Sequence, residues 1–94
     1  MPLLSEDEVD GRLQDGPWRR EGDSLVRDLV FGDFAEALAF VNRVGAAAEH
    51  IDHHPDILLH GYREVRLTLT THSEGGITEA DLALASTVTA LVDA

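Results

Sequence analysis

The sequence predicts an α+β fold in which helices pack on one face of a four-stranded antiparallel sheet. Two pairs of short extended segments each enclose a glycine-containing turn, a pattern typical of β-hairpins. Each pair is followed by apolar residues at helical spacing, and a further helical pattern precedes the first pair. The expected order is therefore α-ββ-α-ββ-α, and hairpins that alternate with helices favour an antiparallel sheet with one covered face.

The composition bounds the class of protein. The chain has 94 residues, of which 44% are hydrophobic and 5% aromatic. We expect a single domain over residues 1–94 with one modest core built mostly from aliphatic side chains. The net charge of −11 would be repelled by a nucleic-acid backbone, so direct DNA or RNA binding is not expected. The absence of cysteine excludes disulfides, thiolate nucleophiles and zinc–thiolate sites.

The first residues do not have the form of a targeting segment. Met1-Pro2-Leu3-Leu4 is followed by acidic residues, without a basic n-region or an apolar h-region. No stretch of the sequence approaches the roughly 18 apolar residues that a membrane span requires. A soluble, cytoplasmic protein without membrane association is expected.

Capping and turn residues define the first three elements. Ser5-Glu6-Asp7-Glu8 has the form of a capping box and predicts a short helix over about Glu6–Gln14. Trp18–Glu21 and Leu25–Phe31 are expected strands. Gly22-Asp23 joins them as a tight turn, because glycine adopts positive φ at little cost.

The longest helix is predicted between the two hairpins. Asp33 is a suitable N-cap, and apolar residues recur from Phe34 to Ala48 at the spacing of an amphipathic helix. Pro55 disfavours the α conformation of the residue before it. The helix should therefore end around residues 49 to 51, and His53-His54 should lie in the connection that follows.

The second half of the chain repeats the layout of a hairpin followed by a helix. Ile57–Gly61 and Glu64–Thr71 are expected strands joined through Gly61-Tyr62-Arg63. Thr78-Glu79-Ala80-Asp81 is a second N-cap pattern, with an acidic residue at the third helical position. An apolar stripe predicts the final helix at Ala80, Leu84, Val88 and Leu91.

Histidines are concentrated in Glu49-His50-Ile51-Asp52-His53-His54-Pro55, with His60 and His72 further along. Because the unperturbed pKa of histidine is about 6.5, such side chains can both give and take a proton near neutral pH. Surface exposure is the simplest interpretation of each histidine taken alone. A metal site is a second interpretation, since His50 and His54 have ligand spacing if both lie on one helix. Pro55 weakens it by placing His54 beyond the helix.

Proton transfer is the third interpretation. A dehydration needs an acid that protonates a departing hydroxyl and a base that accepts a proton from the neighbouring atom. Two or three imidazoles around one small cavity meet that need. The serines do not lie in a nucleophile-elbow context, and no phosphate-binding loop of the GxxxxGK[ST] type is present.

Three groups of residues occur together in a recognisable order: Glu49-x-x-x-His53-His54-Pro55, then Tyr62, then Thr71-His72-x-x-Gly75-Gly76-Ile77-Thr78-x-x-Asp81. In this order and spacing the sequence resembles the pterin-4a-carbinolamine dehydratases, also called 4a-hydroxytetrahydrobiopterin dehydratases. The similarity covers roughly residues 17 to 92. Many members carry an aromatic residue two places after the proline, where this chain has Ile57.

The resemblance implies the same α+β fold and a specific reaction. That reaction is loss of water from a 4a-hydroxytetrahydropterin, which gives a quinonoid dihydropterin. It recycles the pterin cofactor of aromatic amino acid hydroxylases, so a functional link to such a hydroxylase is implied. The resemblance implies neither a metal nor another cofactor.

The resemblance also implies the site residues. His53, His54 and His72 match the three active-site histidines, whereas His50 and His60 match no motif position. We expect one of His53 and His72 to protonate the 4a-hydroxyl and the other to accept the N5 proton, while His54 holds the pterin by hydrogen bonding. Supporting roles, including the orientation of an imidazole by Asp52 or Glu49, are expected for Glu49, Asp52, Pro55 and Asp81.

An interaction module is the competing class of function. Some relatives in animals also act as dimerisation cofactors of a transcription factor, and members of the family are commonly dimers or tetramers. The alanine-rich surface of the last helix, Ala80 to Ala90, could pack against a second copy, so a homodimer or homotetramer is expected. A non-catalytic pterin-binding or dimerisation module would not require three motif histidines, and their presence favours an enzyme.

Overall fold

The computed structural model describes residues 2–93 and contains the elements in the predicted order. The helices and strands are α1 (Glu6–Leu13), β1 (Arg19–Glu21), β2 (Ser24–Val30), α2 (Phe34–Ile51), β3 (Asp56–His60), β4 (Glu64–Leu69) and α3 (Glu79–Asp93). The prediction of an α+β fold with a four-stranded sheet is confirmed. None of these helices is long and apolar enough to cross a bilayer.

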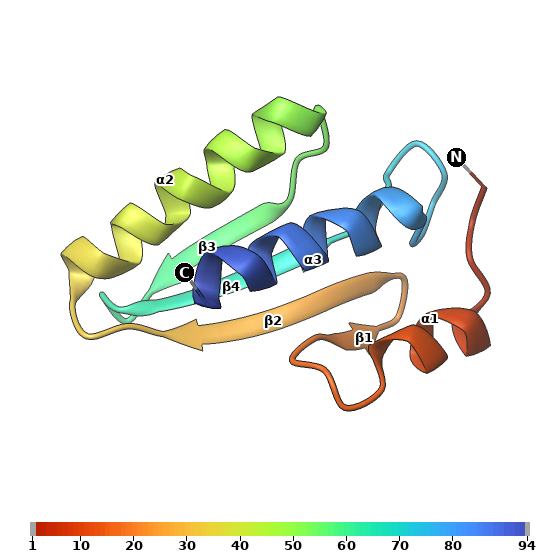
Figure 1. Ribbon diagram of the computed structural model, residues 1–94, viewed down its shortest axis with the longest axis horizontal. Helices are drawn as coiled ribbons and strands as arrows, with labels where there is room; N and C mark the ends of the chain where they lie inside the picture. Colours follow the sequence, from red (N-terminus) through yellow and green to blue (C-terminus); the bar gives the residue numbers. More distant parts are fainter. Residues whose placement is uncertain (1, 94) are drawn as a thin grey trace.

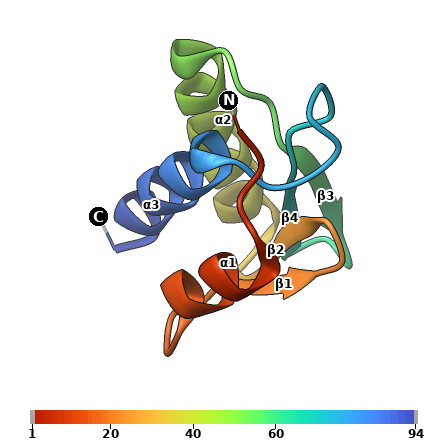
Figure 2. The same cartoon turned by 90° about the vertical axis from the view of Figure 1, so that its right-hand side faces the viewer.

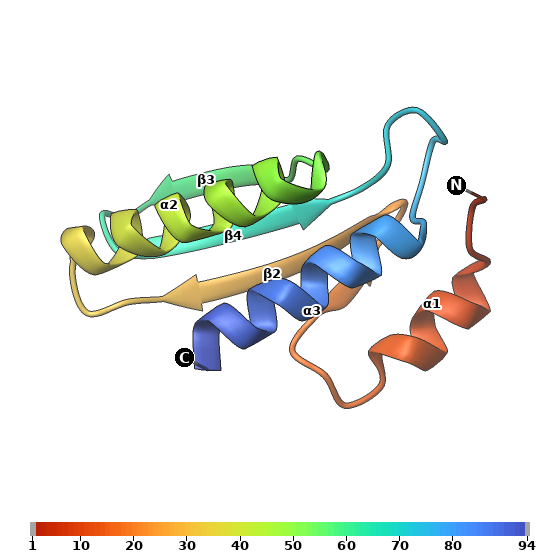
Figure 3. The ribbon, with the colours of Figure 1, turned by 45° about the horizontal axis from the view of Figure 1, so that its top comes forward.

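The sheet has the strand order β1-β2-β4-β3, and all neighbouring strands are antiparallel. The described helices lie on one side of it, with α2 above β3 and β4 and α3 above β2 (Figures 2 and 3). Inward and outward side chains alternate along β4, where Val65, Leu67 and Leu69 are buried. The core between the layers also contains Phe40, Val44, Leu84 and Val88.

Strand boundaries differ slightly from those predicted. His60 pairs with Glu64, so residues 61–63 form the turn between β3 and β4, with positive φ at both Gly61 (55°) and Tyr62 (56°). Gly61 therefore belongs to the turn, and β3 begins one residue earlier than predicted, at Asp56. Strand β4 ends at Leu69 because the chain turns after it, and Thr71 forms only an isolated bridge to Gly76. Helix α1 ends at Leu13, one residue before the predicted end.

The two faces of the sheet carry different charged groups. On the uncovered face, Asp28 accepts hydrogen bonds from Arg66 (2.7 Å) and Arg19 (3.0 Å), which hold the pKa of the Asp28 carboxyl below its ordinary value. On the covered face, Arg27 donates to the hydroxyl of Thr89 at 3.1 Å, and burial lowers the pKa of its guanidinium. The covered face thus holds a desolvated cation among apolar side chains.

Two connections meet at one end of the molecule. The segment between α2 and β3 and the segment between β4 and α3 both lie at the end opposite the β3–β4 turn (Figure 1). The first contains His53 and His54, and the second contains His72 and leads into Asp81. The fold therefore brings the motif residues of both halves of the chain to one end of the sheet.

Candidate active site

The C-terminus of α2 sets the position of His53. Asp52 adopts the left-handed conformation (φ 52°, ψ 43°), and its backbone N–H donates to the carbonyl groups of Ala48 and Glu49. The N–H of His53 also donates to the Ala48 carbonyl, at 3.1 Å. This closes the helix and redirects the chain. Helix α2 thus ends at Ile51, as predicted. Asp52 supports the site through its backbone conformation. Within residues 2–93, its carboxylate has no hydrogen bond.

His53 forms a buried pair with Asp81. Its Nε2 lies 2.6 Å from Oδ1 of Asp81, whose side chain is 0% exposed, while that of His53 is 16% exposed. Asp81 occupies the third position of α3, so its backbone is fixed within a helix. The carboxylate therefore orients the imidazole from a rigid element. The expected orienting residue was Asp52 or Glu49, so the partner of His53 differs from the one expected.

Two threonines complete the surroundings of Asp81. Oδ2 of Asp81 accepts from the Thr71 hydroxyl at 2.8 Å and from the Thr78 backbone N–H at 2.9 Å. The Thr78 hydroxyl lies 2.8 Å from that of Thr71 and accepts from the Ala80 N–H at 3.2 Å. The predicted N-cap at the start of α3 is confirmed, since the Thr78 hydroxyl accepts from the helix backbone and the Asp81 side chain accepts from the Thr78 N–H.

Thr71 and Thr78 belong to the family motif, but the sequence predicts only a strand residue at Thr71 and a helix cap at Thr78, without a role in the site. The spacing Thr78-x-x-Asp81 does signal that these two residues contact each other. Nothing in the sequence signals that the Thr71 hydroxyl joins them, because this depends on the Thr71–Gly76 bridge.

His54 forms a second pair, which is exposed to solvent. Its Nε2 contacts Oε2 of Glu49, and the two side chains are 56% and 76% exposed. Glu49 lies in the last turn of α2, so the pair spans the helix end and the connection after it. The expectation that Glu49 orients an imidazole agrees with this geometry, with His54 as the imidazole.

His72 follows Thr71 in the turn that leads to α3. The turn is closed by hydrogen bonds from Gly75 and Gly76 to the Thr71 carbonyl, and Gly75 has a φ of 77°, which favours glycine. The His72 side chain is exposed and makes no hydrogen bond to a described residue. The structure thus brings His53 and Thr71 each into contact with Asp81, while His72 is the chain neighbour of Thr71.

The remaining histidines lie apart from this group. His50 is exposed in the last turn of α2, and His60 is exposed at the end of β3. Within residues 2–93, no three or more histidine and acidic side chains are placed to hold a metal ion. Tyr62 is 61% exposed at the β3–β4 turn, and Ile57 packs against the core.

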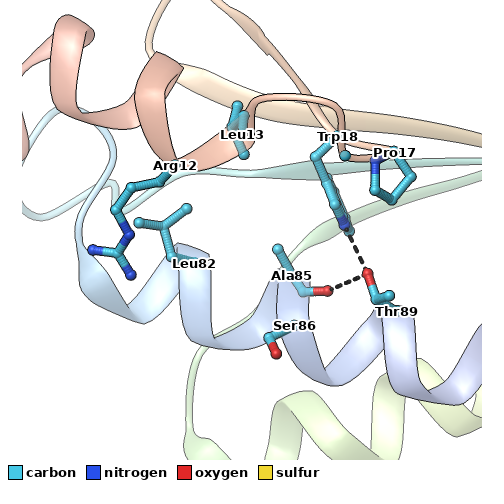
Figure 4. A pocket seen from close by; sticks show the side chains of 9 residues that line it. Arg12, Leu13, Pro17, Trp18, Leu82, Ala85, Ser86 and Thr89 are labelled. Atoms are coloured by element: carbon cyan, nitrogen blue, oxygen red, sulfur yellow. Dashed lines mark hydrogen bonds between the residues drawn. The ribbon is translucent and has the colours of Figure 1, made fainter.

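A cavity of about 260 Å³ lies between α1, the turn after it and α3, and none of the histidines lines it (Figure 4). The indole N–H of Trp18 donates to the Thr89 hydroxyl at 3.3 Å, and that hydroxyl donates to the Ala85 carbonyl at 3.0 Å. Arg12 projects beside Leu82 and donates to Glu79, an exposed contact. The cavity is thus a feature of helix packing separate from the histidine group.

Comparisons with known proteins identify the relatives of the chain. The family model described as pterin 4 alpha carbinolamine dehydratase matches residues 2–91. A protein of Thermomicrobium roseum, provisionally named pterin-4-alpha-carbinolamine dehydratase, is 54% identical over 90% of this chain and 91% of its own length. A protein of Mycobacteroides abscessus with the same provisional name is 48% identical over 94% of each chain.

Two solved structures share the fold. A crystal structure described as a transcriptional coactivator/pterin dehydratase from Brucella melitensis superposes with a TM-score of 0.86, at 34% identity over 96% of this chain and 98% of that one. A pterin dehydratase-like protein described as a RuBisCO assembly factor in the alpha-carboxysome gives a TM-score of 0.67, at 32% identity over 82% and 90%.

Proposed function

Because the chain belongs to the pterin 4-alpha-carbinolamine dehydratase family, we propose that it removes water from 4a-hydroxytetrahydrobiopterin by histidine acid–base catalysis. The observation that carries the proposal is the buried His53–Asp81 pair, which lies beside Thr71-His72 at one end of the sheet. An imidazole held by a buried carboxylate has a defined orientation, which proton transfer at a fixed substrate atom requires.

The proposed reaction needs one acid and one base. The departing 4a-hydroxyl takes a proton from one imidazolium, the C4a–O bond breaks, and water leaves. A neutral imidazole accepts the N5 proton, and the freed electron pair forms the N5–C4a double bond of the quinonoid dihydropterin. One proton is given and one is taken, so the only net loss from the substrate is water.

We assign the two proton transfers to His53 and His72, and pterin binding to His54. A neutral imidazole donates from one nitrogen and accepts at the other, which suits both roles. The exposed His54–Glu49 pair is suited to holding the polar edge of a substrate that arrives from solvent. Pro55 supports the assignment by keeping His53-His54 outside the helix.

Stopped-flow dehydration of synthetic pterin-4a-carbinolamine tests the proposal. His53→Ala and His72→Ala should each lower the rate by on the order of 10²–10⁴-fold, the usual effect of removing a general acid or base. His60→Ala is the matched control, because His60 is exposed at the far end of the β3–β4 hairpin and should leave the rate unchanged. Near-wild-type rates in both His53→Ala and His72→Ala would contradict the assignment.

A non-catalytic interaction module is the second candidate function. It is favoured by the descriptions of the two structural relatives as a transcriptional coactivator/pterin dehydratase and as a RuBisCO assembly factor. A chain that binds a pterin analogue but never accelerates dehydration would reverse the preference for an enzyme. We further propose a cytoplasmic homodimer or homotetramer that serves an aromatic amino acid hydroxylase. Light scattering of the purified protein tests its oligomeric state.

A further inference from the structure

The Asp81 carboxylate faces three groups, two of which can only donate to it. Oδ2 receives the Thr71 hydroxyl and the Thr78 backbone N–H, and Oδ1 lies 2.6 Å from Nε2 of His53. The side chain is fully buried, and a buried carboxylate is tolerated when donors surround it. A carboxylate without a proton only accepts hydrogen bonds. The contact with His53 therefore requires a hydrogen on Nε2.

The hydroxyl groups around Asp81 have a defined direction. Thr71 has one hydroxyl hydrogen, and it donates that hydrogen to Asp81. The 2.8 Å contact between the two hydroxyls then requires Thr78 to donate to Thr71. The Thr78 oxygen in turn accepts from the N–H of Ala80. The hydrogen bonds run in one sense from the backbone of α3 to Asp81, and aligned bonds of this kind strengthen one another.

The hydrogen on Nε2 determines which nitrogen of His53 is free. A neutral imidazole with its hydrogen on Nε2 carries the lone pair on Nδ1. Within residues 2–93, Nδ1 of His53 has no hydrogen-bond partner, and the ring retains 16% of its exposure. Nδ1 is therefore the atom that can accept a proton from a substrate and return one after protonation.

We propose that Thr71 and Thr78 are positioning residues whose hydroxyl groups, acting through Asp81, hold His53 in the Nε2–H tautomer and so make Nδ1 its reacting nitrogen. A capping box at α3 needs the hydroxyl of Thr78 but gains nothing from a hydroxyl at Thr71. The Thr71 hydroxyl thus separates a catalytic role of the threonines from simple helix capping. The role of Nδ1 as the reacting nitrogen rests on the proposed function. The tautomer of His53 does not, because it can be observed without a substrate.

Long-range ¹H–¹⁵N correlation spectra of the labelled full-length protein report the tautomer directly. His53 is assigned by the loss of its resonances in His53→Gln. The wild type should show a protonated, pyrrole-type Nε2 and an unprotonated, pyridine-type Nδ1. In Thr71→Val, which keeps the shape and removes the hydroxyl, the two shifts should move toward each other because both tautomers become populated. Thr71→Ser restores the hydroxyl and should restore the wild-type spectrum.

The same variants are compared for dehydration. Thr71→Val and Thr78→Val should lower kcat about three- to tenfold with little change in KM, the effect of one lost hydrogen bond, and the serine variants should recover the rate. Thr70→Val is the matched control, because the Thr70 hydroxyl donates to the Asp23 carbonyl, and it should change neither readout.

Either of two spectroscopic results overturns the proposal: a wild-type His53 with its hydrogen on Nδ1, or His53 shifts in Thr71→Val that equal those of the wild type. A change confined to His72, the chain neighbour of Thr71, also overturns it. If the tautomer behaves as stated but the wild type does not accelerate dehydration, the tautomer control stands. In that case the proposed function fails, together with the role of Nδ1 in the reaction.

Discussion

His53 and His54 are neighbours in the chain, and the Nε2 atom of each contacts a carboxylate, yet the two pairs differ in nearly every physical respect. The side chains of the His53–Asp81 pair are 16% and 0% exposed, whereas those of the His54–Glu49 pair are 56% and 76% exposed. A buried pair is little screened by solvent, and an exposed pair is weak and mobile. Adjacent histidines therefore need not have equivalent roles.

The difference originates in the elements that supply the carboxylates. Asp81 is in the first turn of α3, where Thr71 and Thr78 also hold it. Glu49 lies in the last turn of α2, and its side chain is largely in solvent. One carboxylate is thus fixed before a substrate arrives, and the other can adjust to it. Preorganised groups serve proton transfer, and adjustable groups serve binding.

The largest loss of stability is expected for Asp81→Asn. The amide cannot accept all three contacts that the carboxylate accepts, so at least one buried donor loses its partner. We expect unfolding in urea to show a loss of about 2–3 kcal/mol, and the dehydration rate to fall on the order of 10²-fold. Asp28→Asn, at an exposed carboxylate on the uncovered face, is the control for removal of an acidic group. If Asp81→Asn and Asp28→Asn had equal effects, the buried carboxylate would be no more important than the exposed one.

Substitution of the two histidines should separate binding from chemistry. His54→Ala is expected to raise KM about tenfold with kcat within about threefold of wild type, since it removes a contact made equally in the ground and transition states. His53→Ala should lower kcat instead. Steady-state kinetics on synthetic carbinolamine measure both constants. A loss of kcat in His54→Ala would mean that the exposed pair takes part in the chemistry.

The sequence predicted the fold and the identities of the motif residues better than it predicted their partners. The N-cap Asp33 and the effect of Pro55 depend on local interactions, and both predictions were confirmed. The partner of His53 depends on a contact across 28 positions of the chain, between a connection and the start of α3. Composition and spacing do not encode such a contact. Glu49, in contrast, is only five positions from His54, and this closeness in sequence allowed it to be predicted as an imidazole partner.

Asp52 tests whether the site depends on a carboxylate or on a backbone conformation. Its φ of 52° lies in the left-handed region, where glycine is favoured. Asp52→Gly should be more stable than Asp52→Ala by about 1 kcal/mol in urea unfolding, because alanine is strained there. Both variants should keep the dehydration rate within about threefold of wild type. A large rate loss in the glycine variant would show that the Asp52 carboxylate acts on an imidazole.

The smallest effect is expected for Glu49→Gln. An exposed pair contributes little, so the free energy of unfolding should change by less than about 0.5 kcal/mol, and kcat by less than about threefold. If Glu49→Gln has a higher KM than the wild type, this difference should disappear in about 1 M salt. At that concentration, salt screens the attraction between His54 and Glu49 in the wild type, so both proteins lack it. Screening should leave the buried pair, and hence kcat, unaffected. If salt lowers kcat of the wild type as strongly as it raises KM, the two pairs are coupled and act as one unit.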